Sequence, residues 1–440
     1  MTRGIGAVIA RIGKKVWARA ALYTVASVVF ALAAGAVATL FPFRIVVDLG
    51  QDSVGTILQI IASSMLTVTT FSLTAMVTAY SSATTTATPR ATQLLIEDRT
   101  SQNALSTFVG GFTFSLVGII ALSTGYYGEQ GRTILFFGTL LMVALIVVTL
   151  LRWIAHLSTF GRMSDVMDRV EAAASRTLTS HAEAPTLGAH RFSELPRGTV
   201  EVPGDTSGFV TFIDLARIER AAARVGVDVY ILAMPGSMVN TRTPLVASTA
   251  SLSDADRDAI VGAFRIPAHR DYEQDPRLGV IALAEIGSRA LSPATNDPGT
   301  AIEVIAALER VFETVLSCTP SDDVEYPHVH VRPVELRDLV TDAFRPIARD
   351  GASIIEVQVR LQKCLATLAD ADADRSFAFR EMAVTAYERS RAALDEWDAP
   401  DLEDVFRAPS GGTPPDTSAG TVDASTSNRR RDPGGGPRTS

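Results

Sequence analysis

Residues 133–157 read TILFFGTLLMVALIVVTLLRWIAHL, and this stretch decides the fold. It carries a single arginine, Arg152, close to its end, and it contains no lysine or acidic residue. A helix needs about 20 consecutive apolar residues to cross the roughly 30 Å of hydrocarbon in a bilayer. A helix in a soluble core is seldom apolar on every side over such a length. The stretch therefore predicts a transmembrane helix.

Three earlier stretches have the same character, at residues 20–43, 54–80 and 104–124. Together the four predict an α-helical integral membrane region over residues 1–157. The composition agrees, because only 20% of the 440 residues are charged, whereas soluble domains carry about a quarter. The competing interpretation of the first stretch is a cleavable signal peptide that ends at the small residues Ala36-Val37-Ala38.

Basic residues flank the predicted spans mostly on one side of the membrane. They are Arg3, Arg11, Lys14, Lys15, Arg19, Arg90, Arg99, Arg152, Arg162 and Arg169. The two loops on the other side carry only Arg44 and Arg132. By the positive-inside rule, this asymmetry predicts a multi-pass protein of the cell membrane with both termini in the cytoplasm.

The rest of the chain divides into two parts. Residues 158–407 alternate short apolar strands with amphipathic helices, which predicts an α+β cytoplasmic domain. Residues 408–440 are rich in Pro, Gly, Ser and Thr and have no apolar periodicity. Such a segment cannot bury enough surface to offset its ordering entropy, so it is expected to be a disordered tail.

Hydroxyl side chains recur along the second predicted span at spacings of three and four residues, which places them on one stripe of a helix. They are Ser63, Thr67, Thr70, Thr74, Thr78, Ser81, Thr85 and Thr88. In one interpretation they pack against neighbouring helices and bond to carbonyls of the preceding turn, and the spacing favours this. In the other, residues from Ser63 to Ser81 line a wet pathway through a homo-oligomer or a bundle. No charged residue lies at the middle of any predicted span, so a proton relay or an ion-pair gate is missing, and this argues against a transporter.

The densest polar grouping lies in the cytoplasmic part, around the predicted helices 278–291 and 301–316. Its members are Arg270, Asp271, Asp275, Arg277, Glu285, Arg289, Asn296 and Asp297. A helix N-terminus beside such residues can bind an anion, so they are the candidate ligand site. The alternative, which the sequence favours, is a network of ion pairs and helix caps. Asp297 before Pro298 is typical of a helix start whatever its function.

Motifs for the common chemistries are missing from the sequence. It has no phosphate-binding loop, dinucleotide fingerprint, HExxH or GxSxG motif, so neither an enzyme nor a cofactor is expected. His328 and His330 share one face of a predicted strand and are weak metal candidates, but Arg332 on that face would repel a cation. The net charge of −8 argues against nucleic acid. Membrane lipid is the expected partner, and a soluble ligand is not identified.

Several short motifs resemble those of the DUF2254 family of predicted membrane proteins. They are QDPRLG at residues 274–279, RALSP at 289–293, NDP at 296–298, GFV at 208–210, ID at 213–214 and PG at 235–236, together with the Ser/Thr-rich second span before Pro89-Arg90. The resemblance covers about residues 15–390, and it departs from the family pattern at Ala294-Thr295. It implies an integral membrane protein with a cytoplasmic domain, and it implies no chemistry.

Two classes of function follow from these patterns. The first is an oligomeric, channel-like or transport-related protein with a hydroxyl-lined second span and a regulatory cytoplasmic domain. The alternative is a membrane-anchored sensor or scaffold that binds a ligand or protein through the Arg/Asp cluster. We take the first as the working hypothesis.

Overall fold

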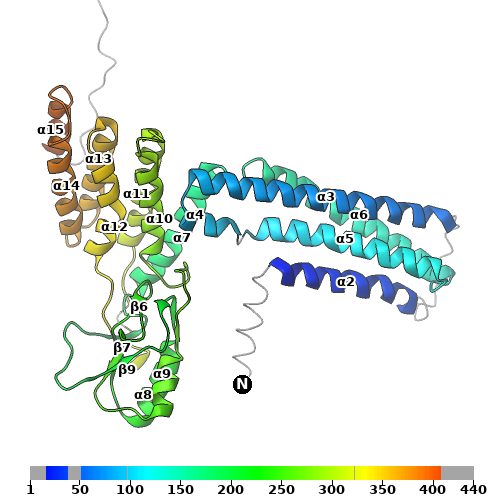
Figure 1. The fold of residues 1–440 in the computed structure, drawn as a ribbon, viewed down its shortest axis with the longest axis horizontal. Coiled ribbons are helices and arrows are strands. Elements are labelled where there is room, and N and C mark those ends of the chain that lie inside the picture. Colours follow the sequence, from blue (N-terminus) through cyan, green and yellow to red (C-terminus); the bar gives the residue numbers. More distant parts are fainter. Residues whose placement is uncertain (1–15, 38–50, 97, 322, 408–440) are drawn as a thin grey trace, which may run out of the picture.

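A computed structural model describes residues 16–37, 51–96, 98–321 and 323–407. The described chain is mostly helical, with candidate membrane spans and an α/β region. Figure 1 shows a long helical bundle that meets a second body crosswise, and this body has a helical part and a sheet part. We call these three parts the bundle, the helical body and the sheet region.

The bundle consists of α2 (Val16–Val37), α3 (Gln51–Thr86), α5 (Arg99–Ser123) and α6 (Glu129–Leu157). Three segments are long and apolar enough to cross a membrane, and these are Ser53–Thr84, Arg99–Ser123 and Gln130–Leu157. They coincide with the second, third and fourth predicted spans. For the first predicted span, the described part of α2 contains a shorter apolar helix, Ala20–Ala33, and residues 38–43 lie outside the described residues.

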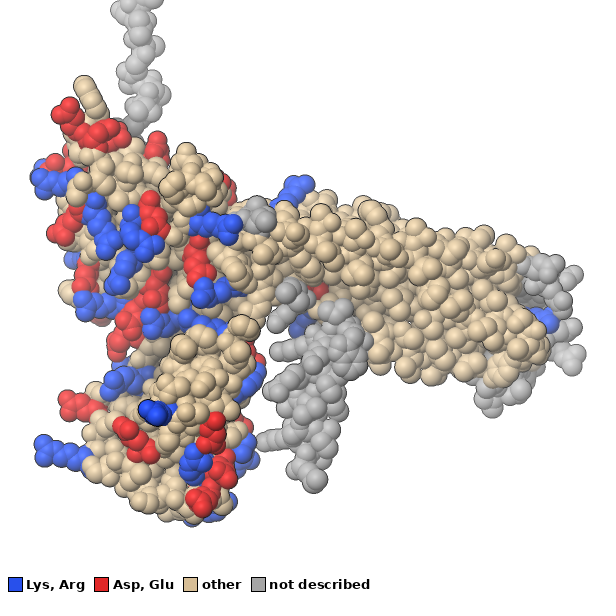
Figure 2. Space-filling view, in the orientation of Figure 1, with Lys and Arg blue, Asp and Glu red and all other residues tan. Residues whose placement is uncertain are grey.

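The outer surface of the bundle is apolar. Figure 2 shows almost no charged side chain along its middle, whereas charged side chains are frequent on the helical body and on the sheet region. Exposed apolar side chains come from all four helices and include Leu22, Val25, Val29, Ile60, Leu66, Phe71, Ile120, Leu141, Leu151 and Ile154. An apolar surface of this size is stable in contact with hydrocarbon, whereas its exposure to water would be unfavourable.

Inside the bundle, small residues of α5 allow the other helices to approach closely. A Cβ atom added at Gly110 would lie 3.1 Å from Ser27 Oγ on α2, and one at Gly118 would lie 3.0 Å from Leu58 on α3. One buried hydrogen bond also links α6 to α3, since Trp153 Nε1 donates to Ser72 Oγ at 2.9 Å. Membrane helices usually pack through small residues and through hydrogen bonds between side chains of neighbouring helices.

The helical body contains the following helices: α7 (Met163–Glu183), α10 (Leu278–Ala290), α11 (Pro298–Leu316), α12 (Leu336–Asp350), α13 (Ile355–Ala371), α14 (Ser376–Arg391) and α15 (Ala399–Arg407). Its core is aromatic and aliphatic, with the Phe312 ring centroid 5.6 Å from those of Phe344 and Phe379. The short helix α4 (Pro89–Ile96) links α3 to α5 and buries Ala91 and Leu95 in this same core. The end of a bundle helix is therefore packed into the helical body.

The sheet region is built on a five-stranded sheet with the order β1-β9-β5-β7-β2. Its strands are β1 (Ala189–Arg191), β2 (Val200–Pro203), β5 (Val229–Ile231), β7 (Pro244–Ser248) and β9 (Tyr326–Val331). β9 pairs in parallel with both β1 and β5, whereas β7 is antiparallel to β5 and β2. Two short antiparallel pairs complete the region, β3 (Gly208–Phe209) with β6 (Met238–Val239) and β4 (Phe212–Ile213) with β8 (Phe264–Arg265).

Two helices, α8 (Leu215–Val225) and α9 (Asp254–Val261), cover one face of this sheet. Ile218 of α8 and Ile260 of α9 lie in one buried cluster with Val229 and Val329 of the central strands. Asp214 and Ser253 cap the two helices, because their side chains accept hydrogen bonds from Arg217 N and Asp256 N. Asp and Ser are among the residues preferred at the N-cap position of a helix.

The charged stretch from Asp372 to Trp397 does not form a single helix, because α14 spans only Ser376–Arg391. Asp372 instead forms a turn, in which its carboxylate accepts hydrogen bonds from the backbone N–H groups of Asp374 and Arg375. Asp side chains favour such turns because they compete with helical hydrogen bonds.

Candidate functional site

The hydroxyl stripe lies on the outer surface of the bundle. Its candidate pathway-lining members, Ser63, Thr67, Thr70, Thr74, Thr78 and Ser81, are all exposed. The opposite face of α3 carries Leu58, Met65 and Ser72, which are buried against the other bundle helices. The stripe is therefore not packed inside the bundle of one chain. Thr88 is buried beyond the end of α3, and the side chain of Thr85 lies outside the described residues.

The hydroxyl protons of the stripe are satisfied within α3 itself. Thr67, Thr70, Thr74 and Thr78 each donate to the carbonyl four residues earlier at 3.0 Å, and Ser63 donates to the carbonyl of Gln59 at 3.1 Å. This is the bonding that serine and threonine adopt in membrane helices. Each hydroxyl oxygen also has lone pairs, and because the side chains are exposed, the face can accept hydrogen bonds from water or from another chain.

Three contacts fasten the end of α3 and α4 to the helical body. The Arg289 Nη1 group donates to Ala87 O at 3.0 Å, and the Tyr272 hydroxyl donates to Arg90 O at 3.0 Å. Arg90 also forms an ion pair with Glu285 on α10. Burial raises the pKa of Glu285, although Arg90 acts in the opposite direction. These contacts connect α10 and the loop before it to the segment that follows α3.

Arg270 and Asp275 form the most buried ion pair of the predicted cluster. The guanidinium donates to both carboxylate oxygens, at 2.6 and 2.9 Å, and the Asp275 side chain is only 1% exposed. Asp275 Oδ1 also accepts the backbone N–H groups of Arg277 and Leu278, so it caps the start of α10. Gly236, at φ +95°, lies against the pair, and a Cβ atom there would be 2.7 Å from Asp275 Oδ1. The pair thus lies within the loop between β8 and α10, and it packs against Gly236.

The remaining members of the predicted cluster have separate partners. Arg277 donates to both carboxylate oxygens of Asp342 on α12, at 2.6 and 3.0 Å. Asp297 caps α11 by accepting from Thr300 N at 3.1 Å, and hydrogen bonds from Thr300 lower its pKa. Asn296 occupies the preceding loop at φ +49°, and Asp271 accepts from Glu273 N at 3.0 Å. The structure does not gather these eight residues around one opening, and their contacts are those of a capping and ion-pair network.

A second polar centre, which sequence reasoning missed, surrounds Asp98 where the bundle meets the helical body. Asp98 is 7% exposed and caps α5 by accepting from Ser101 N at 2.6 Å. His156 Nε2 of α6 lies 3.0 Å from its carboxylate, and Arg169 Nη1 of α7 donates to it at 2.8 Å. Burial acts to raise the pKa of Asp98, but the hydrogen bonds from His156, Ser101 and Arg169 hold it well below its usual value. This centre joins three helices.

Comparison with known proteins agrees with this architecture. A family model described as "Predicted membrane protein (DUF2254)" matches residues 13–367. The chain belongs to the DUF2254 family. The match includes the bundle, the sheet region and most of the helical body, and it ends within α13.

Relatives of this DUF2254 protein occur in mycobacteria. One from Mycobacterium bovis and one from Mycobacterium tuberculosis, each named only as an uncharacterized protein, are 27% identical to it over 253 residues. The aligned region covers 53% of this chain and 47% of each relative, so the chain spans about half the length of the curated relatives it matches. No solved structure matches the chain.

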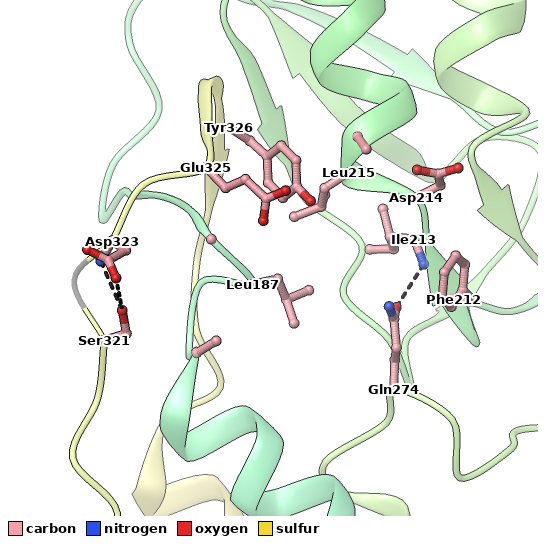
Figure 3. Close-up of a pocket in the computed structure, with 13 residues that line it drawn as sticks. Leu187, Phe212, Ile213, Asp214, Leu215, Gln274, Ser321, Asp323, Glu325 and Tyr326 are labelled. Carbon is pink, nitrogen blue, oxygen red and sulfur yellow. Dashed lines mark hydrogen bonds between the residues drawn. The ribbon is translucent and has the colours of Figure 1, made fainter.

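This DUF2254 protein also has a pocket of about 440 Å³ where the helical body meets the sheet region (Figure 3). Asp214, Asp323 and Glu325 contribute carboxylates to its lining, and none of the described residues that line it is an arginine or lysine. Gln274 reaches it from the loop before α10, and its side-chain oxygen accepts a hydrogen bond from Ile213 N at 2.9 Å. The pocket lies beside the predicted cluster and contains none of its eight residues.

The two candidate metal ligands of the DUF2254 protein lie on β9 and have different partners. His328 Nδ1 is 2.8 Å from Glu219 Oε1 on α8. The His330 ring stacks on Tyr230 at 4.4 Å and on His190 at 5.4 Å between centroids. Among the residues that the structure describes, no three His, Cys, Asp or Glu side chains are grouped so that they could hold a metal ion.

Proposed function

We propose that the protein is an oligomeric, channel-like or transport-related protein of the cell membrane, in which the hydroxyl face of α3 lines a path between neighbouring copies. The observation that carries this proposal is the position of the stripe on the outside of the bundle. The described residues of a single chain do not cover it. Its regulatory part would be the α+β domain over residues 158–407.

The residues beside the stripe support contact between copies rather than exposure to lipid. Exposed apolar side chains border it on both edges, with Ile60 and Phe71 on one edge and Leu66, Leu73 and Val77 on the other. In an oligomer, the apolar edges of two or more such faces would pack against one another. The hydroxyl groups would then be enclosed between the chains. Small hydroxyl side chains suit close helix contact, and their oxygen lone pairs can replace part of the hydration of a passing solute.

The proposal places four spans in the membrane, with α2 as the first of them and a membrane domain over residues 1–157. α2 packs alongside α5, since the Tyr127 hydroxyl donates to Ala31 O at 2.6 Å and Phe30 lies 5.9 Å from Phe114 between ring centroids. Its outward residues Leu22, Val25 and Val29 are exposed, as for a helix in contact with lipid. With the basic residues on one side, both termini lie in the cytoplasm.

Regulation would pass through the contacts at the end of α3. Arg289, Tyr272 and Glu285 of the helical body hold the segment from Ala87 to Arg90. Ala83 at the end of α3 is itself part of the buried core of the helical body. Because packed cores shift between discrete arrangements, a rearrangement of α10 would turn or tilt α3.

Cysteine cross-linking in membranes tests whether the hydroxyl faces meet. In a background with Cys318→Ser, the variant Thr74→Cys is treated with a short thiol-specific cross-linker. We expect covalent oligomers in several-fold greater yield than for the matched control Leu141→Cys, which places the thiol on the exposed, apolar side of α6. Equal yields at the two positions would reject the contact.

The alternative function, a membrane-anchored sensor, is favoured by the acidic pocket of Figure 3 at the junction of two parts of the molecule. Ligand sites occur preferentially at such junctions. Reconstituted vesicles distinguish the two functions, because the first requires solute or ion flux that depends on Thr70 and Thr74, and the second requires none.

A further inference from the structure

We propose that Arg99, Arg152 and Arg162 form a binding site for the phosphate group of an anionic phospholipid, at the end of the bundle next to the helical body. We call these three residues the arginine edge. The inference goes beyond the proposed function, because it needs only that α5 and α6 cross the membrane.

The three arginines lie near one level of the membrane. Arg99 is the first residue of α5, and Arg162 lies directly before α7. The contact of 3.0 Å between Asp98 and His156 fixes the start of α5 beside the end of α6. Arg152 is one helical turn before His156, which is about 6 Å along the axis of α6. An arginine side chain is long enough to span this distance along the helix axis.

All three guanidinium groups are available to a ligand. Each side chain is exposed, and in the described parts of the chain none of them forms an ion pair. The nearby carboxylates of Asp98 and Asp165 are already occupied by Arg169. Among the residues that the structure describes, these three positive charges therefore have no counter-ion.

The surroundings of Arg152 determine the kind of ligand. Val148, one helical turn before Arg152, and Leu151, directly before it, are exposed apolar residues. A guanidinium group on a hydrocarbon-facing surface extends toward the headgroup layer, where phosphate is the abundant anion. Arginine binds phosphate through two parallel hydrogen bonds. Because the three charges are not neutralised, a lipid with net negative charge is preferred over a zwitterionic one.

The test uses the full-length chain purified in detergent. Its thermal unfolding is followed with added phosphatidylglycerol, with phosphatidylcholine and with inorganic phosphate. We expect phosphatidylglycerol to raise the midpoint by several degrees and the other two additives to have no effect, because a ligand that binds the native state stabilises it. In the double variant Arg99→Gln/Arg152→Gln, the rise should disappear.

The matched control is Arg380→Gln/Arg391→Gln, which removes two exposed arginines from α14, far from the bundle. It should keep the full response to phosphatidylglycerol. As a second readout, native mass spectrometry should show phosphatidylglycerol retained by the unmodified chain and by the control, and lost from the double variant. The proposal is overturned if the double variant retains the lipid and the rise, or if inorganic phosphate produces the same rise.

Discussion

Replacing Asp275 by alanine is expected to lower the free energy of unfolding by about 3–5 kcal/mol, the usual cost of removing one partner of a buried ion pair. Arg270 would keep its charge at a largely buried position with no carboxylate to accept its hydrogen bonds. The start of α10 would also lose the acceptor for the N–H groups of Arg277 and Leu278. Thermal or chemical unfolding of the purified chain in detergent measures the effect.

The control for this prediction is Arg277→Gln, which breaks the ion pair to Asp342. The Arg277 side chain is 38% exposed, and such pairs contribute about 1 kcal/mol or less. A small loss for Asp275→Ala, similar to that of the control, would contradict the structural role assigned to the pair. It would then favour the hypothesis that Arg270 and Asp275 bind a ligand.

Replacing Gly279 by leucine is expected to prevent the native contact of α7 with α10. A Cβ atom at this position would lie 2.4 Å from Ala174 Cβ and 2.5 Å from Ala174 Cα, so the two helix backbones would have to separate. Overpacking normally costs about 1–3 kcal/mol, and a clash with backbone atoms lies at or above the top of that range. The yield of monodisperse protein and its melting temperature measure the effect.

Gly55→Ala is the matched control, because a Cβ atom there meets no atom within 4 Å. An alanine in the first turns of α3 should leave the melting temperature unchanged or raise it slightly. If Gly279→Leu and the control had the same melting temperature, the close crossing of α7 and α10 would not exist in the folded protein.

The membrane region could be predicted from the sequence because its signal is local. A long apolar run determines a spanning helix without any knowledge of its neighbours, and three of the predicted runs coincide with candidate spans. The spacing of the hydroxyl residues likewise predicts that they share a face. It could not predict that this face lies outside the bundle, because that depends on which side of α3 packs against α5.

The polar contacts also divide into local ones, which the sequence predicts, and long-range ones, which it does not. Asp297 could be recognised as the cap of α11, since its partner Thr300 is three residues away and Pro298 follows it. The pairs of Glu285 with Arg90 and of Asp98 with His156 join residues on different helices, far apart in the chain. Their partners are set by tertiary packing, so no local pattern predicted them.

The measurement that tests the central claim most directly is a structure of the full-length assembly in a lipid nanodisc. We expect two or more copies in which the α3 helices face one another, with Thr70 and Thr74 of neighbouring chains across a hydrated path. A monomer, or an assembly in which these threonines contact only lipid, would contradict the proposed function.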